Sequence, residues 1–170
     1  MMSPATKAAV QPDDVEAAMK RAMRLLGVRA RSCKELRDRM LRAGFEPETV
    51  EAVEMRLLDV GLLDDESFAA QVVRRGTETG RSARLTRQDL QRFGVGVEVA
   101  DASLAGMEVP GSDEDRALAL AEKKAAACRN LHIDKAVARV VRHLCSKGYG
   151  PQLAWEVTRR VFRERDFPDD

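Results

Sequence analysis

The chain has 170 residues, of which 44% are hydrophobic and 34% are charged, and its 29 Lys and Arg almost balance its 28 Asp and Glu. This balance leaves no global charge that would by itself indicate a nucleic-acid-binding protein. No apolar run reaches the ~18 residues of a membrane span, and the first residues lack a signal-peptide segment, so a cytoplasmic protein is expected. Three cysteines without a Cys-x-x-Cys motif argue against a disulfide framework.

The first predicted repeat covers residues 13–61 and follows an N-terminal tail over residues 1–12, expected to be disordered. Apolar residues with helical period over Val15–Leu26 predict its first helix, which ends at Gly27. Ser32 and Glu35 form a capping box in front of the second helix. The third helix is predicted to begin at Pro47, shortly after Gly44, and Gly61 closes the repeat.

Three glycines, Gly44, Gly94 and Gly148, each stand between two predicted helices and suit the left-handed residue that ends a helix. Side chains recur, mostly apolar, four residues before each glycine and six, nine and thirteen residues after it. They are Met40, Leu90 and Leu144; Val50, Ala100 and Ala154; Val53, Ser103 and Val157; and Leu57, Met107 and Val161. Spacings of three and four mark one buried helix face. The sequence therefore predicts an all-α fold, an elongated array of three tandem three-helix repeats that resemble helix-turn-helix units.

The second repeat is predicted over residues 62–107 and the third over residues 113–165, with a hinge at 108–112 and a C-terminal tail at 166–170. The hinge is expected because the stretch GMEVPGS contains two glycines and a proline. Asp64 and Asp65 introduce the second repeat and are interpreted as helix caps rather than as magnesium ligands or general acids. Cys128 and His132 lie four residues apart but match no common zinc module, so neither a metal nor a cofactor is expected.

The aromatic side chains are expected to fill the small cores of the repeats. A base-stacking platform is the other interpretation, but the aromatics are scattered along the chain rather than clustered. The six to which this expectation applies, of seven aromatics in the chain, are Phe45, Phe68, Phe93, Tyr149, Trp155 and Phe162.

Basic side chains cluster in three stretches, and their binding partner could be nucleic acid or an acidic protein, because arginine pairs with phosphate and carboxylate alike. The second-repeat arginines would project from one side if helical order begins early enough. They are Arg74, Arg75, Arg81, Arg84, Arg87 and Arg92. The third-repeat cluster consists of Lys123, Lys124, Arg129, Lys135, Arg139, Arg142 and Lys147. For the first-repeat cluster, diluted by acids, a solvated face is the preferred interpretation; its members are Arg29, Arg31, Lys34, Arg37, Arg39 and Arg42.

The local motifs of common catalytic sites are missing. The sequence has no GxxxxGK[ST] phosphate loop, no GxGxxG, no GxSxG elbow and no HExxH. No catalytic residue and no enzymatic activity are therefore expected.

The segment GLLDDESFA, Gly61–Ala69, followed by a valine and two arginines, resembles the signature of the RecX family of bacterial recombination regulators. The similarity extends over Ala17–Val161, with the third repeat matching only in outline, and two positions depart from the family pattern. Arg81 stands where the family usually has proline, and Phe93 where it often has a basic residue. The positions that carry the signature are Leu63, Asp64, Asp65, Phe68, Ala69, Gly44 and Gly94.

The resemblance implies a non-enzymatic, all-helical protein that binds the filament of the RecA recombinase on single-stranded DNA and suppresses its ATPase, strand exchange and extension. It implies a monomer, and it leaves weak direct DNA binding open. The alternative is a helix-turn-helix-type DNA-binding transcriptional regulator, whose recognition helix would enter a major groove. Against that alternative, no dimerisation or ligand domain is visible. A purely structural scaffold would need no clustered arginines.

Overall fold

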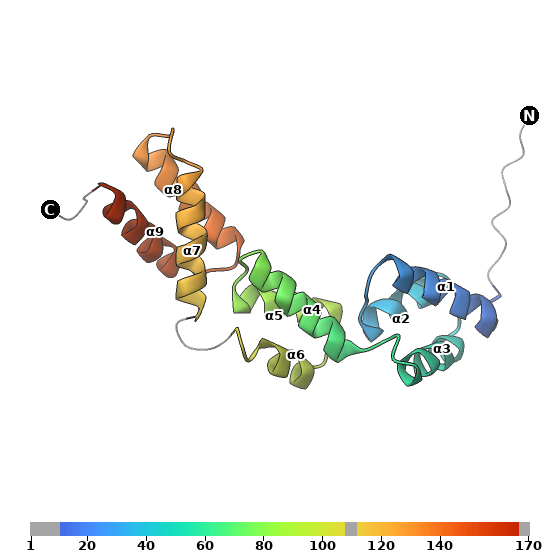
Figure 1. Ribbon diagram of the computed structural model, residues 1–170. Coiled ribbons are helices and arrows are strands. Elements are labelled where there is room, and N and C mark those ends of the chain that lie inside the picture. Colours follow the sequence, from blue (N-terminus) through green and yellow to red (C-terminus); the bar gives the residue numbers. More distant parts are fainter. Residues whose placement is uncertain (1–10, 108–111, 167–170) are drawn as a thin grey trace, which may run out of the picture. The chain divides into compact units, whose positions relative to one another are not determined.

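The computed structural model describes residues 11–107 and 112–166, and within them the chain forms nine α-helices and no strand (Figure 1). The all-α prediction is confirmed. The helices are α1 (Val15–Val28), α2 (Cys33–Arg42), α3 (Pro47–Asp59), α4 (Asp65–Glu78), α5 (Ala83–Phe93), α6 (Val97–Leu104), α7 (Ser112–Ala126), α8 (Ile133–Ser146) and α9 (Pro151–Asp166). We refer to α1–α3, α4–α6 and α7–α9 as the first, second and third repeats. Residues 1–10, 108–111 and 167–170, which hold most of both predicted tails and of the predicted hinge, lie outside the described residues.

The chain divides into two compact units. The first unit contains the described part of Met1–Phe68 together with Phe93–Gly96, and the second contains that of Ala69–Arg92 and Val97–Asp170. The border between the units therefore runs through the second repeat. No helix of the described residues is long and apolar enough to cross a membrane.

Local sequence explains the helix ends of the first repeat. Asp14 caps α1 by accepting a hydrogen bond from the Ala17 amide at 2.8 Å. The helix continues to Val28, one residue beyond the predicted end at a glycine. Ser32 caps α2 by accepting from the Glu35 amide at 3.1 Å, which confirms one half of the predicted capping box.

The predicted inner face of the repeats is confirmed. Every position at the recurring offsets from the three glycines is buried except Ser103, which is half-buried. One apolar cluster, which includes Leu36, Met40 and Leu57, forms the core of the first repeat. A second cluster, which includes Val140 and Leu144, forms the core of the third. The first and third repeats thus each bury one apolar stripe per helix in a small core of their own.

The three turn glycines adopt the left-handed conformation that the sequence predicts. Their φ angles are +95° at Gly44, +76° at Gly94 and +94° at Gly148. At Gly44 the amide donates to Leu41 and the next amide to Met40, so the last carbonyls of α2 are satisfied. The same pattern of bonds closes α8 at Gly148.

Consecutive repeats are joined by the same contacts in both units. In the first unit, the Cys33 amide at the start of α2 donates to Asp65 of the next repeat at 2.8 Å. In the second unit, the Ala83 amide at the start of α5 donates to Asp113 of the next repeat at 3.3 Å. The residue before each of these helices also donates to a carbonyl at the C-terminal end of the next repeat's second helix. The Ser32 hydroxyl donates to the Phe93 carbonyl, and the Ser82 amide donates to the Lys147 carbonyl. The repeat in sequence is therefore also a repeat in how neighbouring units dock.

Candidate interaction surface

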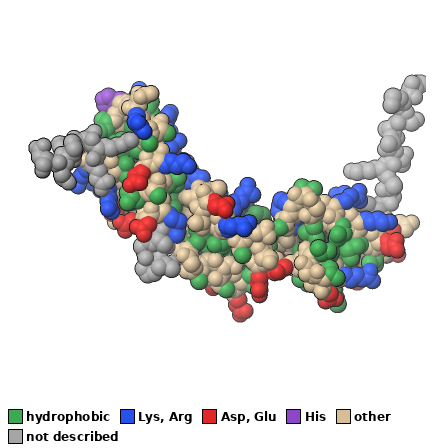
Figure 2. Space-filling view, in the orientation of Figure 1, with side chains coloured by type: hydrophobic (Ala, Val, Ile, Leu, Met, Phe, Trp, Pro, Cys, Tyr) green, Lys and Arg blue, Asp and Glu red, His purple; other side chains and the backbone are tan. Residues whose placement is uncertain are grey.

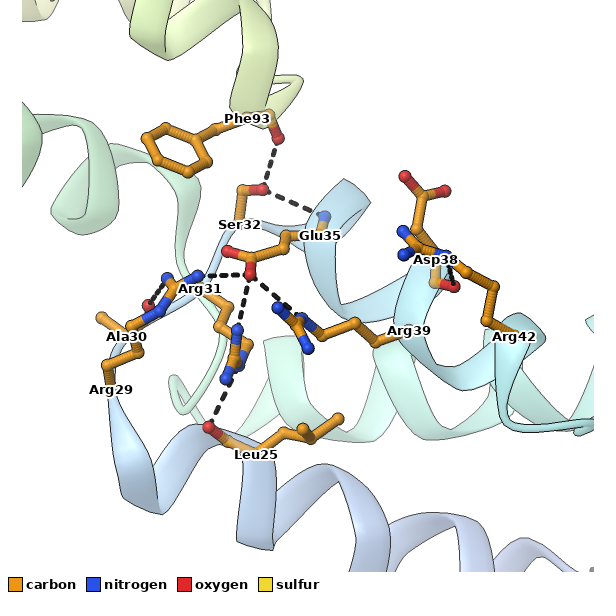
Figure 3. Close-up of polar contacts among 10 residues, drawn as sticks. All are labelled: Leu25, Arg29, Ala30, Arg31, Ser32, Glu35, Asp38, Arg39, Arg42 and Phe93. Carbon is orange, nitrogen blue, oxygen red and sulfur yellow. Dashed lines mark hydrogen bonds and ion pairs between the residues drawn. The ribbon is translucent and has the colours of Figure 1, made fainter.

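Three arginines of the first repeat surround one carboxylate. The Oε1 atom of Glu35 accepts hydrogen bonds from Arg29, Arg31 and Arg39, the last at 3.1 Å (Figure 3). Arg31 is buried, and its Nε also donates to the Leu25 carbonyl at 3.1 Å. These side chains hold the end of α1 against the start of α2, so the solvated face expected of this cluster is wrong for Arg31.

The arginines determine the ionisation of Glu35. Burial by itself would raise the pKa of Glu35, but hydrogen bonds from Arg29 and Arg39 and the charges of Arg29 and Arg31 outweigh it and leave this pKa below its ordinary value. The carboxylate is therefore charged at neutral pH and acts as the anionic centre of the cluster. A neighbouring pair behaves alike, because Arg37 Nη2 lies 2.7 Å from the buried Glu54 carboxylate and its own pKa is raised by that contact.

The acidic and aromatic positions of the family signature have structural roles. Asp64 accepts from the amides of Glu66 and Ser67 at 2.8 and 3.1 Å, which confirms its interpretation as a cap of α4. These bonds, that to Ser67 first, lower the pKa of Asp64. Asp65 accepts from the α2 amide described above, so it caps a helix of the preceding repeat. Phe68 packs edge-on against Phe93 with ring centroids 5.3 Å apart, which accounts for an aromatic residue at the second departure from the family pattern.

Three of the remaining signature positions, Leu63, Ala69 and Gly94, are buried or closely approached by another side chain. Leu63 and Ala69 are buried in the described fold. A Cβ atom built on Gly94 would lie 2.1 Å from Cδ of Lys34, so only glycine fits there without movement. Gly44, in contrast, has open space around it, and only its φ angle favours glycine.

The second-repeat arginines are less free than their sequence suggests. Arg81 precedes α5, which begins at Ala83, and pairs with Asp89. Arg84 donates to the Gly148 carbonyl at 3.0 Å from Nη2, and Arg87 pairs with Asp101. These three therefore contribute to packing inside the second unit rather than forming one free helical stripe.

The other members of that cluster remain exposed. Arg74 lies 3.9 Å from the exposed Glu78, and Arg75 is exposed next to it near the end of α4. Arg92 is exposed and lies 3.3 Å from Asp89. Arg84 is exposed too, despite its bond to the Gly148 carbonyl. The prediction that this cluster binds a partner stays a prediction, and its exposed members are Arg74, Arg75, Arg84 and Arg92.

Helix α8 carries an exposed basic stripe. Lys135, Arg139 and Arg142 follow one another at spacings of four and three, which places them on one helix face. All three are exposed, whereas Val140 and Leu144 on the opposite face are in the core. Arg129, in the connection before α8, is exposed too. Lys and Arg side chains are visible over α7–α9 in the space-filling view (Figure 2).

The predicted lysines of α7 line a basic pocket inside the second unit. This pocket has a volume of about 610 Å³. Two of its lining residues are bonded to each other, because Lys147 Nζ donates to the Thr79 carbonyl at 2.9 Å. Glu78 is its one acidic lining residue among those described. Its basic or titratable lining residues are Arg116, Lys123, Lys124, His143 and Lys147.

Burial and the positive charges lining this pocket affect the same imidazole, that of His143. Burial lowers the pKa of His143, and the charges of Lys124 and Lys147 lower it further. Sequence reasoning did not include His143 or Arg116 in the site. Both residues line the pocket only because α7 and α8 pack against each other. The sequence offered no signal for them beyond their spacing along each helix.

Known proteins are similar to this chain in sequence and in fold. Residues 18–54 match the family model described as RecX, first three-helix domain. A regulatory protein RecX from Amycolatopsis mediterranei is 38% identical over 141 residues, which are 82% of this chain and 80% of that protein. The chain belongs to the RecX family. A second RecX relative, from Mycobacterium avium, is 36% identical over 152 residues and covers 86% of both chains.

Solved RecX structures show the same fold. The crystal structure of RecX from Lactobacillus salivarius has a TM-score of 0.67 at 18% identity and covers 88% of this chain and 97% of that one. Another crystal structure, of a regulatory protein RecX, has a TM-score of 0.64 at 24% identity and covers 86% of this chain and 71% of that one. The family resemblance stated from the sequence is therefore confirmed.

Proposed function

We propose that this RecX-family protein is a non-catalytic negative regulator of RecA. It binds, as a monomer, in the helical groove of the RecA filament on single-stranded DNA and suppresses ATP hydrolysis, strand exchange and filament extension. Membership of the RecX family carries this proposal, since the relatives that establish it are named as regulatory proteins. By this action it modulates recombination and DNA repair in the cytoplasm.

The exposed basic side chains supply the contacts. Arg139 and Arg142 on α8, together with the pocket lysines Lys123 and Lys124, offer positive charge to acidic protein surfaces or phosphates. Weak contacts of this kind add up when one chain touches successive subunits of a filament. Of the arginines already bonded inside the second unit, Arg84 links the second repeat to the third, whereas Arg81 and Arg87 pair with acids of the second repeat itself.

The test is inhibition of RecA ATP hydrolysis on single-stranded DNA while the protein is titrated in. Arg139→Glu combined with Arg142→Glu is expected to weaken inhibition at least about tenfold, because two exposed charges are reversed without breaking any contact described for these residues. The matched control is Arg21→Glu combined with Arg56→Glu, which reverses two exposed charges of the first repeat. The control is expected to inhibit like the parent protein.

Direct binding to the same DNA without RecA separates the two functional hypotheses. Inhibition at protein concentrations that scarcely bind bare DNA supports a filament-directed regulator. No effect on RecA, combined with tight and salt-sensitive binding to duplex DNA, would instead support the helix-turn-helix regulator.

A further inference from the structure

The single tryptophan of the chain does not lie in the core. Trp155 is 46% exposed, which contradicts the expectation that all six aromatics fill the cores. Phe45, Phe68 and Tyr149 are buried as predicted, and the other two aromatics are half-buried.

The position of Trp155 follows from the packing of α9. Ala154, Val157 and Val161 are buried and face the core of the third repeat. A residue next to a buried one is rotated by about 100° around a helix, so Trp155 lies outside this core-facing stripe. Its exposure is therefore set by the helix register.

Two arginines share the face of Trp155. Arg159 and Arg163 lie four and eight residues further along α9, which places all three side chains within about 80° of arc and the two arginines about 6 Å apart along the axis. Both arginines are exposed, and neither has an ion-pair partner among the described residues. Together with Glu156 and Arg160, they line a hollow of about 470 Å³.

The charges flanking this face are partly engaged. Arg160 lies 4.0 Å from Glu114 of α7, and Glu156 accepts a hydrogen bond from Gln152 at 3.0 Å. The one acid beside the tryptophan thus sits among three arginines, and the face is positive overall.

We propose that this face of α9 binds single-stranded nucleic acid. An unpaired base stacks on the indole of Trp155, and backbone phosphates pair with Arg159 and Arg163. An aromatic ring beside cations is how non-specific single-strand sites are built, because every base has a face to stack and every nucleotide carries a phosphate. Arginine suits the phosphate because its planar fork donates two parallel hydrogen bonds.

A single strand fits this face better than a duplex or an apolar protein. The bases of a duplex are already stacked on one another and offer an indole no free face. An apolar partner would have to desolvate the arginines that flank the tryptophan, without a matching charge. The inference concerns nucleic acid alone and holds whether or not the chain acts on RecA.

The emission of Trp155 reports binding directly, because the protein has one tryptophan. The experiment titrates the full chain with a 20-nucleotide oligothymidine at low salt and follows tryptophan fluorescence. Stacking is expected to quench it, and the apparent affinity should fall as salt rises. The same titration with a fluorescein-labelled strand, read by anisotropy, allows variants without tryptophan to be compared.

The variants separate stacking from charge. Trp155→Ala is expected to weaken anisotropy-detected binding about fivefold to 150-fold, the range measured for one stacked base, whereas Trp155→Phe keeps a ring and most of the affinity. Arg159→Glu with Arg163→Glu should weaken binding at least tenfold, and the first-repeat control Arg21→Glu with Arg56→Glu should not. Circular dichroism verifies that each variant remains helical.

Three results would overturn the proposal. One is binding of the labelled strand without any change in Trp155 emission. Another is equal affinity of the parent protein and Trp155→Ala. The third is tighter binding of a 20-base-pair duplex than of the single strand, which would indicate docking in a groove. If the oligothymidine titration and the variants behave as expected but the protein does not inhibit RecA, the proposed function is refuted and this site remains.

Discussion

Replacing Gly148 by alanine is expected to destabilise the protein by about 2–5 kcal/mol. Gly148 has a φ of +94°, and an L-residue in this left-handed region costs about 1–2 kcal/mol. The added Cβ would also lie 2.4 Å from Cβ of Leu85 and 2.5 Å from Oγ of Ser82. Leu85 Cβ is fixed to the backbone of α5, so the helices themselves must move, and such overpacking adds about 1–3 kcal/mol.

Gly44→Ala is the matched control. Gly44 has nearly the same φ, +95°, and the corresponding place after the second helix of its repeat, but an alanine there would meet nothing within 4 Å. It should lose only the conformational part, about 1–2 kcal/mol. The difference between the two variants therefore measures the close approach at the junction of the second and third repeats.

The assay is urea unfolding followed by circular dichroism and by Trp155 fluorescence. Trp155 lies in the second unit with Gly148, so its emission reports the unit in which the clash occurs. Circular dichroism reports the helices of both units and is the common probe for the two variants. Equal losses of free energy for Gly148→Ala and Gly44→Ala would refute the reasoning, because the clash would then contribute nothing.

Three further predictions follow from the side-chain environments. Glu35→Gln should lower the free energy of unfolding by about 1–3 kcal/mol at pH 7, as expected for hydrogen bonds between charged groups. Since the pKa of Glu35 is lowered in the folded state, this difference should shrink as the pH falls through that pKa. A difference in urea unfolding that stays constant down to acidic pH would contradict this reasoning. Burial, and then the nearby Asp65, raise the pKa of Cys33 to about 12, so iodoacetamide at neutral pH should label the exposed Cys145 far faster, as peptide mapping would show; equal rates would be contrary to the structure. Burial, and then the charges of Lys124 and Lys147, should lower the pKa of His143 below the ordinary histidine value in an NMR pH series. An ordinary value would mean that the imidazole is less buried or that the pocket lysines lie further away.

The sequence predicted those features that depend on short spacings. The offsets around Gly44, Gly94 and Gly148 located the buried face of the helices, because helical period is a local property. Ser32 was identified as a cap for the same reason.

Long-range partners could not be predicted in this way. Arg84 was expected on a free face, but its acceptor is a carbonyl 64 residues away, which only the docking of the third repeat brings near. Glu35 fits a capping-box pattern, yet its Oε1 is taken by arginines on both sides of the helix start. The expectation that Trp155 fills a core was wrong, although short spacings alone could have shown this. The offsets place Ala154, Val157 and Val161 on one face of α9, and at about 100° per residue Trp155 lies about 100–160° away from each of them, so the helical spacing already indicated its exposure.

The free basic stripe of α8 follows from how the repeats dock. Glu35, Leu85 and Arg139 each lie nine residues before a turn glycine and are therefore equivalent positions. In the first repeat this position is Glu35, the carboxylate that the arginines of the first-repeat cluster surround. In the second repeat it is Leu85, which lies against Gly148 of the next repeat. Within the described residues no further repeat covers α8, and the equivalent position is an exposed arginine.

This difference accounts for where the side chains of the proposed partner-binding surface are exposed. In the first two repeats, charged side chains near this position are used to hold helices or repeats together, as Arg31 and Arg84 show. In the third repeat, Arg139 and Arg142 are exposed to solvent instead. A guanidinium group in such a place is able to replace its bound water by a carboxylate or a phosphate. Side chains at and near this position therefore serve cohesion in the first two repeats, whereas in the third they are exposed, as the proposed recognition of a partner requires.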